Sequence, residues 1–177
     1  MDILKSPLLT DLYQLTMLQG YIEEGLHGEA VFEFYVRQMP ENRSFFLAAG
    51  LESCLGFLEN LAFPEEELRY LEKTKRFSSA LIDYLRVLRF NGDVHGLREG
   101  TVFFPNEPLL RITAPLPVAQ LIETRLINFL HFETLIATKA ARCTLAAQGR
   151  AVLIDFGLRR AHGAEAGLLA ARACYLA

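Results

Sequence analysis

The stretch from residue 151 to residue 163 constrains the fold more than any other part of this sequence. It opens with an uninterrupted apolar run, residues 151–154, and then changes abruptly to Asp155, a phenylalanine, a glycine and two arginines. A short continuous apolar run is typical of a strand that is buried on both faces. An isolated charge inside such a strand costs several kcal/mol, so Asp155 and the residues after it are expected at the strand's carboxyl end. Because α/β folds place their ligand sites at that end, the stretch also predicts a ligand site.

The chain before this stretch combines helical patterns with short strands. Helix-start residues and apolar residues at helical spacing predict helices beginning at Ser6-Pro7, at Gly50, near Pro64 and after Ser78. Alternating polar and apolar residues predict a half-buried strand over residues 29–37, and residues 45–47 are expected to continue a sheet. Residues 93–98, 101–104 and 109–112 are short, turn-bounded segments that predict a β-meander. A long helical tract follows over residues 118–148, with two helices meeting near residues 131–133.

The end of the chain has the order expected of an α/β barrel. The apolar strand at residues 151–154 is followed by a helix over residues 164–177, which together make one βα unit. A complete α/β barrel takes about 250 residues, whereas this chain has 177. We therefore expect a mixed α+β N-terminal domain at residues 1–114. Residues 115–177 are expected to form connecting helices and the first βα unit of an incomplete, irregular α/β barrel.

Composition excludes several classes of protein. Apolar residues make up 51% of the chain and charged residues 22%, which favours a globular core over disorder. The net charge is −3 and no stretch clusters Lys and Arg with aromatic residues, so nucleic acid is not an expected partner. No apolar run approaches the roughly 20 residues of a membrane helix, so no membrane partner is expected either. Cys54, Cys143 and Cys174 are odd in number and widely spaced, which favours reduced thiols in a cytoplasmic protein and no metal site.

Three sequence motifs resemble those of the nicotinate phosphoribosyltransferases. They are TDLYQLTM at residues 10–17, ATKAAR at residues 137–142 and DFGLRRAHG at residues 155–163. The resemblance extends across essentially the whole chain, and members of that family are much longer. It therefore implies the N-terminal portion of a type II phosphoribosyltransferase-like fold, truncated before the rest of the barrel.

The resemblance also implies an activity and its partners. Enzymes of that family join nicotinate to the ribose of phosphoribosyl pyrophosphate in NAD biosynthesis, and the products are nicotinate mononucleotide and pyrophosphate. The resemblance implies ATP hydrolysis coupled to this reaction and Mg²⁺ on the pyrophosphate. It further implies a homodimer with a shared active site, which the first helix of one subunit reaches from the other. The energy-coupling histidine of the family is expected beyond Ala177, so no catalytic residue is predicted within this chain.

The substrate-binding residues follow from the motifs and from the chemistry of nicotinate, a flat anion. Phe156 is similar to the family's aromatic residue on one face of the pyridine ring, and Tyr13, supplied by the other subunit, to the one on the opposite face. Arg159 corresponds to the arginine that meets the carboxylate, which a planar guanidinium can bind bidentately. Asp11 matches an acid near the ring, and Arg37 a basic residue near the substrate phosphates. We expect Phe156 and Arg159 to border one cavity.

Other residues have weaker assignments. His162 is counted among the substrate-binding candidates because it lies in the third motif, and the roles of His162 and Arg160 are left open. Arg159 could instead pair with Asp155, and each aromatic candidate could instead be a packing residue. Glu123 and Glu133 are ten residues apart, which matches no known carboxylate pair, so surface or helix-cap roles are expected for both.

Three alternative functions remain open at this point. The first is a nicotinamide or quinolinate phosphoribosyltransferase, which would act on a different pyridine. The second is a non-catalytic truncated product that only binds or dimerises. The third is a generic anion-binding α/β module.

Overall fold

The computed structural model describes residues 6–177, which fall into two compact units. The first unit comprises the stretch ending at Phe32, together with Leu55–His95 and Arg111–Leu126. The second comprises Glu33–Cys54, Gly96–Leu110 and Ile127–Ala177. The expected boundary between domains at residues 114 and 115 stays a prediction.

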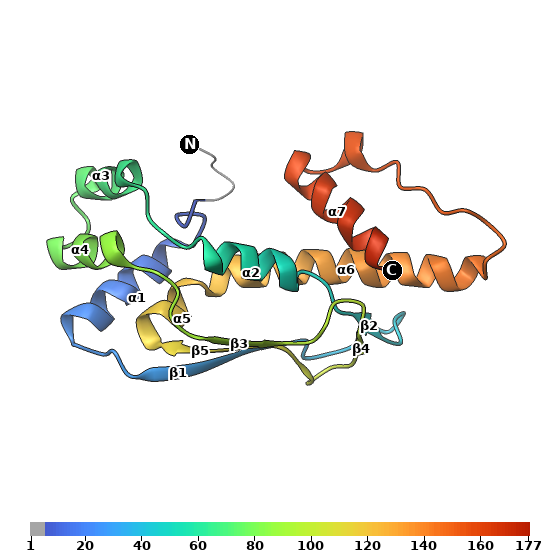
Figure 1. The fold of residues 1–177 in the computed structure, drawn as a ribbon, viewed down its shortest axis with the longest axis horizontal. Helices are drawn as coiled ribbons and strands as arrows, with labels where there is room; N and C mark the ends of the chain where they lie inside the picture. Colours follow the sequence, from blue (N-terminus) through green and yellow to red (C-terminus); the bar gives the residue numbers. More distant parts are fainter. Residues whose placement is uncertain (1–5) are drawn as a thin grey trace. The chain divides into compact units, whose positions relative to one another are not determined.

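Helices form most of the first unit (Figure 1). They are α1 (Leu12–Glu23), α3 (Glu65–Thr74), α4 (Ser79–Val87) and α5 (Leu116–Leu121), with α1 packed on both α4 and α5 and with α3 packed on α4. The predicted starts of α3 and α4 are confirmed. Three glutamates follow Pro64 in the first turn of α3, where the helix dipole favours negative charge. The Ser78 hydroxyl accepts a hydrogen bond from the Leu81 amide and caps α4.

Helix α1 begins later than the sequence predicted. Ser6 and Pro7 belong to a separate turn, in which the Leu9 amide donates to the Ser6 carbonyl and the Leu8 amide to the Ser6 hydroxyl. The residue before the helix is Asp11, whose backbone is extended at φ −77° and ψ 147°. An extended residue interrupts the helical hydrogen-bond ladder, so the serine–proline pair marks a turn and Asp11 marks the helix start.

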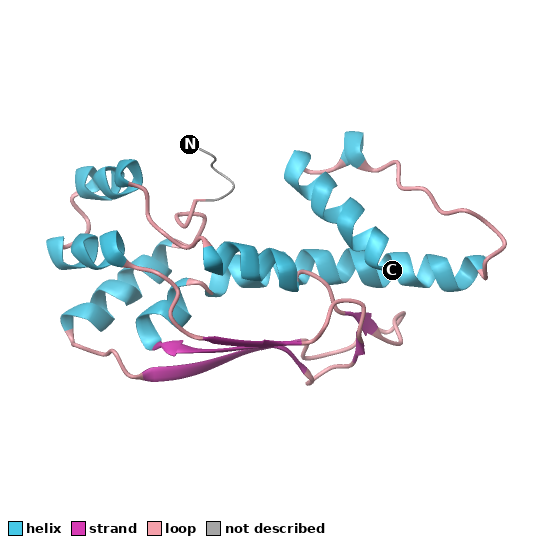
Figure 2. Cartoon of the chain, viewed as in Figure 1, coloured by secondary structure: helices cyan, strands magenta, loops and turns pink. Residues whose placement is uncertain are grey.

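Two small sheets hold the strands (Figure 2). β1 (Glu29–Tyr35), β5 (Pro108–Pro115) and β3 (Asp93–Gly96) form one sheet in the order β1-β5-β3. β2 (Phe46–Leu47) and β4 (Val102–Phe103) form an antiparallel pair, in which Phe46 lies opposite Phe103 with ring centroids 5.4 Å apart. The predicted meander is therefore wrong. β4 does not pair with β3 or β5 but with β2, where the buried rings of Phe46 and Phe103 stack. The alternating burial of β1 is confirmed.

The long helical tract breaks at a different point from the one predicted. α5 ends at Leu121 and α6 runs from Glu123 to Ala147, with the break at Ile122. Residues 131–133 lie inside α6 and continue it without interruption. No glycine or proline marks either position, so local sequence signals do not locate the break.

Helix α2 (Leu51–Glu59) is confirmed near its predicted start, and α7 (Ala164–Leu176) at its predicted position. In the second unit the C-terminal half of α7 meets α6 at an oblique angle (Figure 1), and a cluster of buried apolar side chains joins the two helices to β2. The buried members of this cluster are Leu47, Ala49, Ala137, Ala141 and Ala173.

The apolar run at residues 151–154 does not form the predicted buried strand. Residues 152–157 are a loop in Figure 2 and belong to no helix or strand. Val152 is 87% exposed and Ile154 69% exposed. A strand requires a neighbour for its backbone hydrogen bonds, and no segment among residues 6–177 is paired with this run. The protein is thus mixed α+β, as expected, without a formed barrel strand in the part described.

Candidate functional site

Asp11 and Tyr13 lie at the start of α1 and contact polar side chains of the same unit. The Tyr13 ring is 51% exposed, whereas the neighbouring Gln14 is fully buried. Gln14 Nε2 lies 3.1 Å from the Tyr13 hydroxyl, and it also donates to Glu123 Oε2 at 3.0 Å. The Thr124 hydroxyl donates to Asp11 Oδ2 at 3.2 Å. The Tyr13 hydroxyl and the Asp11 carboxylate are therefore held by hydrogen bonds, while the tyrosine ring remains open to solvent.

Helix α5 completes this network. The Gln120 side-chain amide, which is also buried, donates to Gln14 Oε1. Gln14 thus uses its acceptor toward α5 and its donors toward the first turn of α6. Both glutamines lie on buried helix faces, where an amide without partners costs about 1–3 kcal/mol. The buried glutamine in the first motif is a supporting residue that the sequence alone did not single out.

The 155–163 motif has a different environment. Asp155 Oδ1 accepts a hydrogen bond from the Gly157 amide at 2.7 Å, and this local turn leads into the short 3-10 helix η2 (Leu158–Arg160). Phe156 is 81% exposed, and Arg159 is exposed as well. The motif is shaped by its own backbone, and its two principal candidates face solvent.

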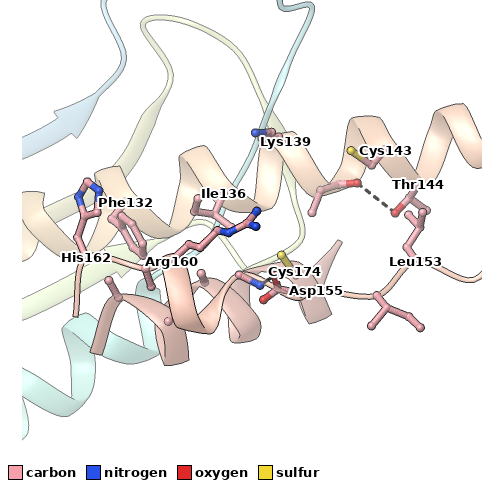
Figure 3. Close-up of a pocket in the computed structure, with 17 residues that line it drawn as sticks. Phe132, Ile136, Lys139, Cys143, Thr144, Leu153, Asp155, Arg160, His162 and Cys174 are labelled. Carbon is pink, nitrogen blue, oxygen red and sulfur yellow. Dashed lines mark hydrogen bonds between the residues drawn. The ribbon is translucent and has the colours of Figure 1, made fainter. Parts of the chain in front are cut away.

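A cavity of about 720 Å³ opens beside the motif (Figure 3). Its ionisable lining residues are Lys139 and Cys143 from α6, Cys174 from α7, and Asp155, Arg160 and His162 from the motif. Neither Phe156 nor Arg159 lines it, so this cavity does not join them as we expected. The two motif residues without assigned roles, Arg160 and His162, are the ones that face it.

Arg37 lies two residues beyond the end of β1 and is exposed. It belongs to the second unit, as do Phe156, Arg159 and His162, whereas Asp11 and Tyr13 belong to the first. The substrate-binding roles of all six residues stay predictions.

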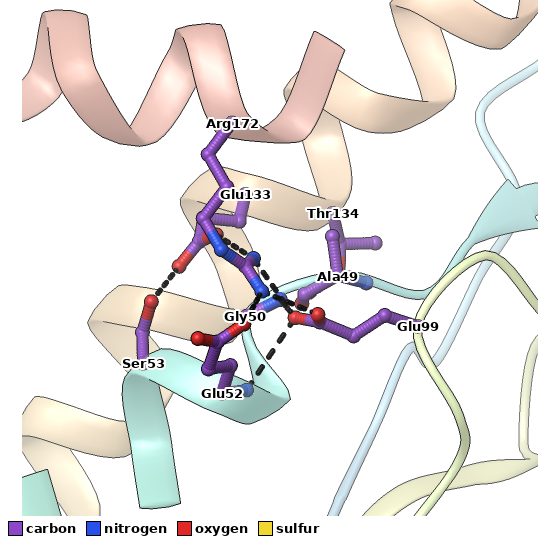
Figure 4. A network of polar contacts seen from close by, with 8 residues as sticks. All are labelled: Ala49, Gly50, Glu52, Ser53, Glu99, Glu133, Thr134 and Arg172. Carbon is purple, nitrogen blue, oxygen red and sulfur yellow. Dashed lines mark hydrogen bonds and ion pairs between the residues drawn. The ribbon is translucent and has the colours of Figure 1, made fainter. Parts of the chain in front are cut away.

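A cluster of charged side chains lies beneath α7 (Figure 4). Arg172 contacts Glu133 at 2.9 Å, Glu99 at 2.5 Å and Glu52 at 2.6 Å. Glu133 is fully buried and also accepts a hydrogen bond from the Ser53 hydroxyl at 2.5 Å. The surface or cap role expected for Glu133 is therefore wrong, because α6 turns this position inward. Its helical spacing from Leu130 and Ala137, both buried, is the sequence signal that could have shown this.

The carboxylates of the cluster have opposite electrostatic environments. Burial acts to raise the pKa of Glu99, but hydrogen bonds from Arg172 and from the Gly50 and Glu52 amides outweigh it and lower that pKa. For Glu133 burial dominates and raises the pKa, against the opposing effects of Ser53 and Arg172. The hydrogen bond to Glu99 raises the pKa of Arg172, which stays a cation.

Among residues 6–177, no group of three or more His, Cys, Asp or Glu side chains is arranged to hold a metal ion. In the same range, no helix is both long and apolar enough to cross a bilayer. Cys54, Cys143 and Cys174 are not joined by a disulfide in this structure.

Residues 8–131 match the sequence model of the nicotinate phosphoribosyltransferase (NAPRTase) N-terminal domain. The chain belongs to the nicotinate phosphoribosyltransferase family. It is 48% identical over 170 residues to nicotinate phosphoribosyltransferase pncB2 of Mycobacterium tuberculosis, an alignment that covers 96% of this chain and 36% of the relative. It is 42% identical over 168 residues to the nicotinate phosphoribosyltransferase of Bacillus subtilis, covering 94% of this chain and 34% of that protein.

Solved structures agree with this assignment to the family. The crystal structure of human nicotinic acid phosphoribosyltransferase superposes with a TM-score of 0.85 at 38% identity, covering 94% of this chain and 34% of that one. Nicotinate-nucleotide pyrophosphorylase from Pyrococcus furiosus has the same fold, with a TM-score of 0.75 at 23% identity over 98% of this chain and 37% of its own. The chain thus spans about a third of the length of its family relatives.

Proposed function

We propose that this chain is the N-terminal part of an enzyme that transfers the phosphoribosyl group of phosphoribosyl pyrophosphate to nicotinate. The products are nicotinate mononucleotide and pyrophosphate, in NAD biosynthesis. The observation that carries this proposal is the 48% identity to a nicotinate phosphoribosyltransferase, in an alignment that covers 96% of the chain.

The proposed reaction is a displacement at the first carbon of the ribose. The pyridine nitrogen of nicotinate forms a bond to that carbon while the bond to pyrophosphate breaks, and pyrophosphate leaves with the electron pair. Positive charge develops on the ribose, so the barrier is lowered chiefly by holding the two substrates in line and by stabilising the leaving group. For this chain the proposed task is to hold the pyridine.

Two features support that task. The exposed rings of Tyr13 and Phe156 are available for stacking, and each stacked pair adds about 1 kcal/mol beyond burial. Arg159, two residues beyond Gly157, presents an exposed guanidinium that can bind the nicotinate carboxylate with two parallel hydrogen bonds. We further propose that Asp11 lies near the ring, and that Arg37 binds a substrate phosphate.

The dimer, the cellular compartment and the cofactors are also part of the proposal. Exposed apolar side chains on α1, Leu12 at 54% and Met17 at 42%, support a homodimer in which α1 reaches the partner subunit. The cytoplasm is proposed as the compartment from cysteine usage alone. Mg²⁺ and ATP are proposed from the family alone, because no three-residue metal cluster is present among residues 6–177. Mg²⁺ commonly binds substrate phosphates and few protein groups, so we assign no ligand for it and no step to it.

The test is the activity of the full-length protein with nicotinate, nicotinamide and quinolinate. We expect the unmodified protein to prefer nicotinate. Removing a charge-assisted bidentate contact costs about 3 kcal/mol, so Arg159→Ala should lower kcat/KM for nicotinate about 100-fold. The exposed Arg86 is the matched control, and Arg86→Ala should leave this value unchanged.

Two results would contradict the proposal in different ways. Unchanged preference for nicotinate in Arg159→Ala would remove the carboxylate role of Arg159 and leave the enzyme assignment intact. Absence of turnover with all three pyridines in the unmodified protein would overturn the enzyme assignment and favour a non-catalytic binding or dimerising product.

A further inference from the structure

Helix α7 connects the charged cluster to the 155–163 motif. It begins at Ala164, directly after the motif ends, and Arg172 follows eight residues later. At about 1.5 Å per residue, Arg172 lies roughly 12 Å along the helix from its first turn. Because a helix moves largely as one body, contacts that hold it at Arg172 also fix its N-terminal end, which follows the motif.

The first turn of α7 packs directly on η2. Leu158 Cδ1 lies 2.4 Å from the position that a β-carbon on Gly167 would occupy, and the Ala161 β-carbon lies 3.5 Å from it. The glycine lets Leu158 lie directly against the helix, and a larger residue at position 167 would require the Leu158 side chain to move. η2 contains Arg159, so the position of this arginine depends on where α7 lies.

The apolar contacts of α7 lie in its C-terminal half. Ala173 is fully buried among alanines of α6, and the partly buried Leu176 packs on the same cluster. Apolar contacts are not directional, so they do not by themselves fix how far the helix slides or rotates. The polar contacts of Arg172 are directional and reach three separate segments of the chain.

Figure 4 shows how Arg172 reaches them. One nitrogen of its guanidinium donates to Glu133 on α6 at 2.9 Å, and both of its terminal nitrogens donate to Glu99 at 3.0 and 2.5 Å. Glu99 in turn accepts the Gly50 amide at 2.7 Å, next to the first turn of α2. Gly50 has φ +98° and its backbone packs against the backbone of Phe129 and Leu130 of α6. The amide that donates to Glu99 is therefore itself held in place.

From this geometry we propose that Arg172 is a positioning residue, which fixes α7 and thereby the placement of Arg159 toward the pyridine carboxylate. This role rests on the function proposed above. Arg172 does not contact substrate. It acts through the helix and through the contact between Leu158 and Gly167.

The chain supplies a matched control for this proposal. Arg86 also contacts three acidic residues, Glu65, Glu72 and Asp83, but on an exposed surface of the first unit. Arg86→Met removes the same charge and a similar number of ion pairs without touching α7. Arg172→Lys keeps the charge but loses the planar guanidinium, and a lysine ammonium cannot bind Glu99 and Glu133 in the same geometry.

The experiment measures the ratio of kcat/KM for nicotinate to that for nicotinamide in the full-length protein. Loss of a positioned Arg159 weakens recognition of the carboxylate, so Arg172→Met should lower this ratio at least about tenfold, with KM for phosphoribosyl pyrophosphate within about twofold. Arg172→Lys should fall between Arg172→Met and the unmodified protein, and Arg86→Met should match the latter. A loss of folded protein alone would lower all activities together and leave the ratio unchanged. An unchanged ratio in both Arg172 variants would overturn the proposal.

A second measurement does not depend on activity. The Arg160 amide donates to the Gly157 carbonyl and the Ala161 amide to the Leu158 carbonyl, so both amides report on η2. Hydrogen exchange at these two amides should accelerate at least about tenfold in Arg172→Lys relative to Arg86→Met. Equal exchange would overturn the positioning role even if the protein proved inactive, whereas inactivity with accelerated exchange would contradict the proposed function only.

Discussion

The two segments proposed to hold the pyridine are supported in different ways. Asp11 and Tyr13 are held by uncharged amide and hydroxyl groups of the same unit, chiefly the fully buried Gln14 and the partly exposed Thr124. The 155–163 motif is preceded by an exposed loop and supported only after its end, through α7 and the ion pairs of Arg172. The first segment is therefore held by uncharged groups of its own helical unit, whereas the second depends on the contacts of α7.

The largest difference is expected in local stability. In the 177-residue chain, amides of residues 152–156 should exchange with solvent at least about 100-fold faster than those in the middle of α1, because no helix or strand protects them. Hydrogen exchange followed by mass spectrometry or NMR measures this directly. Comparable protection in both segments would show that residues 152–156 are paired, and the contrast between the two segments would disappear.

Removing Gln14 should disturb the first segment alone. Gln14→Leu removes the hydrogen bonds of Gln14 to Gln120 and Glu123 and leaves the buried Gln120 amide only its long contact with Met17, so the free energy of unfolding should fall by about 2 kcal/mol. Urea denaturation measures this value, and the exposed Gln38→Leu is the control. A cost within about 0.5 kcal/mol of the control would show that the amide network does not support α1.

Acid should disturb the second segment and spare the first. The pKa of Glu99 lies below its ordinary value of 4.5, so its ionised form stabilises the fold above pH 4.5 and this contribution is lost as the pH falls below 4.5. The pKa of Glu133 is raised, so this group protonates first and its protonation is not itself destabilising. Exchange at the amides of η2 should therefore accelerate below pH 4.5, after correction for the intrinsic pH dependence of exchange.

Glu99→Gln tests the cause of this acid response. The variant carries no ionisable group at position 99, so the acceleration of η2 exchange below pH 4.5 should be absent. Persistence of the full response in Glu99→Gln would assign it to another carboxylate. An equal response in α1 would remove the contrast in electrostatic support between the two segments.

The smallest effect is expected from Thr124→Val, which keeps the shape of the side chain and removes its hydroxyl. The lost hydrogen bond to Asp11 is exposed, so the free energy of unfolding should fall by only about 0.5 kcal/mol. The informative readout is KM for nicotinate in the full-length protein, which should rise if Thr124 orients Asp11. An unchanged KM would limit the support of this segment to Gln14.

The predictions that succeeded depend on signals within a few residues. Ser78 caps α4 through its own side chain, and the acidic first turn of α3 follows Pro64 directly. Alternation along β1 likewise needs no information from elsewhere in the chain. Propensity and capping act over one helical turn, so the sequence shows them directly.

The predictions that failed depend on distant partners. β4 pairs with β2 through Phe46 and Phe103, and α6 runs unbroken through residues that resembled a junction. Glu133 could be recognised as inward-facing from its spacing, but not as the partner of Arg172, 39 residues away. These outcomes follow from which segments meet in space.

The sequence by itself determined the family of this protein, the positions of most helices and the chemistry available in its three motifs. Only the tertiary structure decided which strands pair, that Gln14 supports Tyr13, and that Arg172 gathers three carboxylates beneath α7. It also showed that the apolar run at residues 151–154 is not a strand here. The physical reason is that an apolar run favours a strand without forming one. A strand needs a neighbouring segment for its backbone hydrogen bonds, and a buried charge needs an oppositely charged or hydrogen-bonding partner.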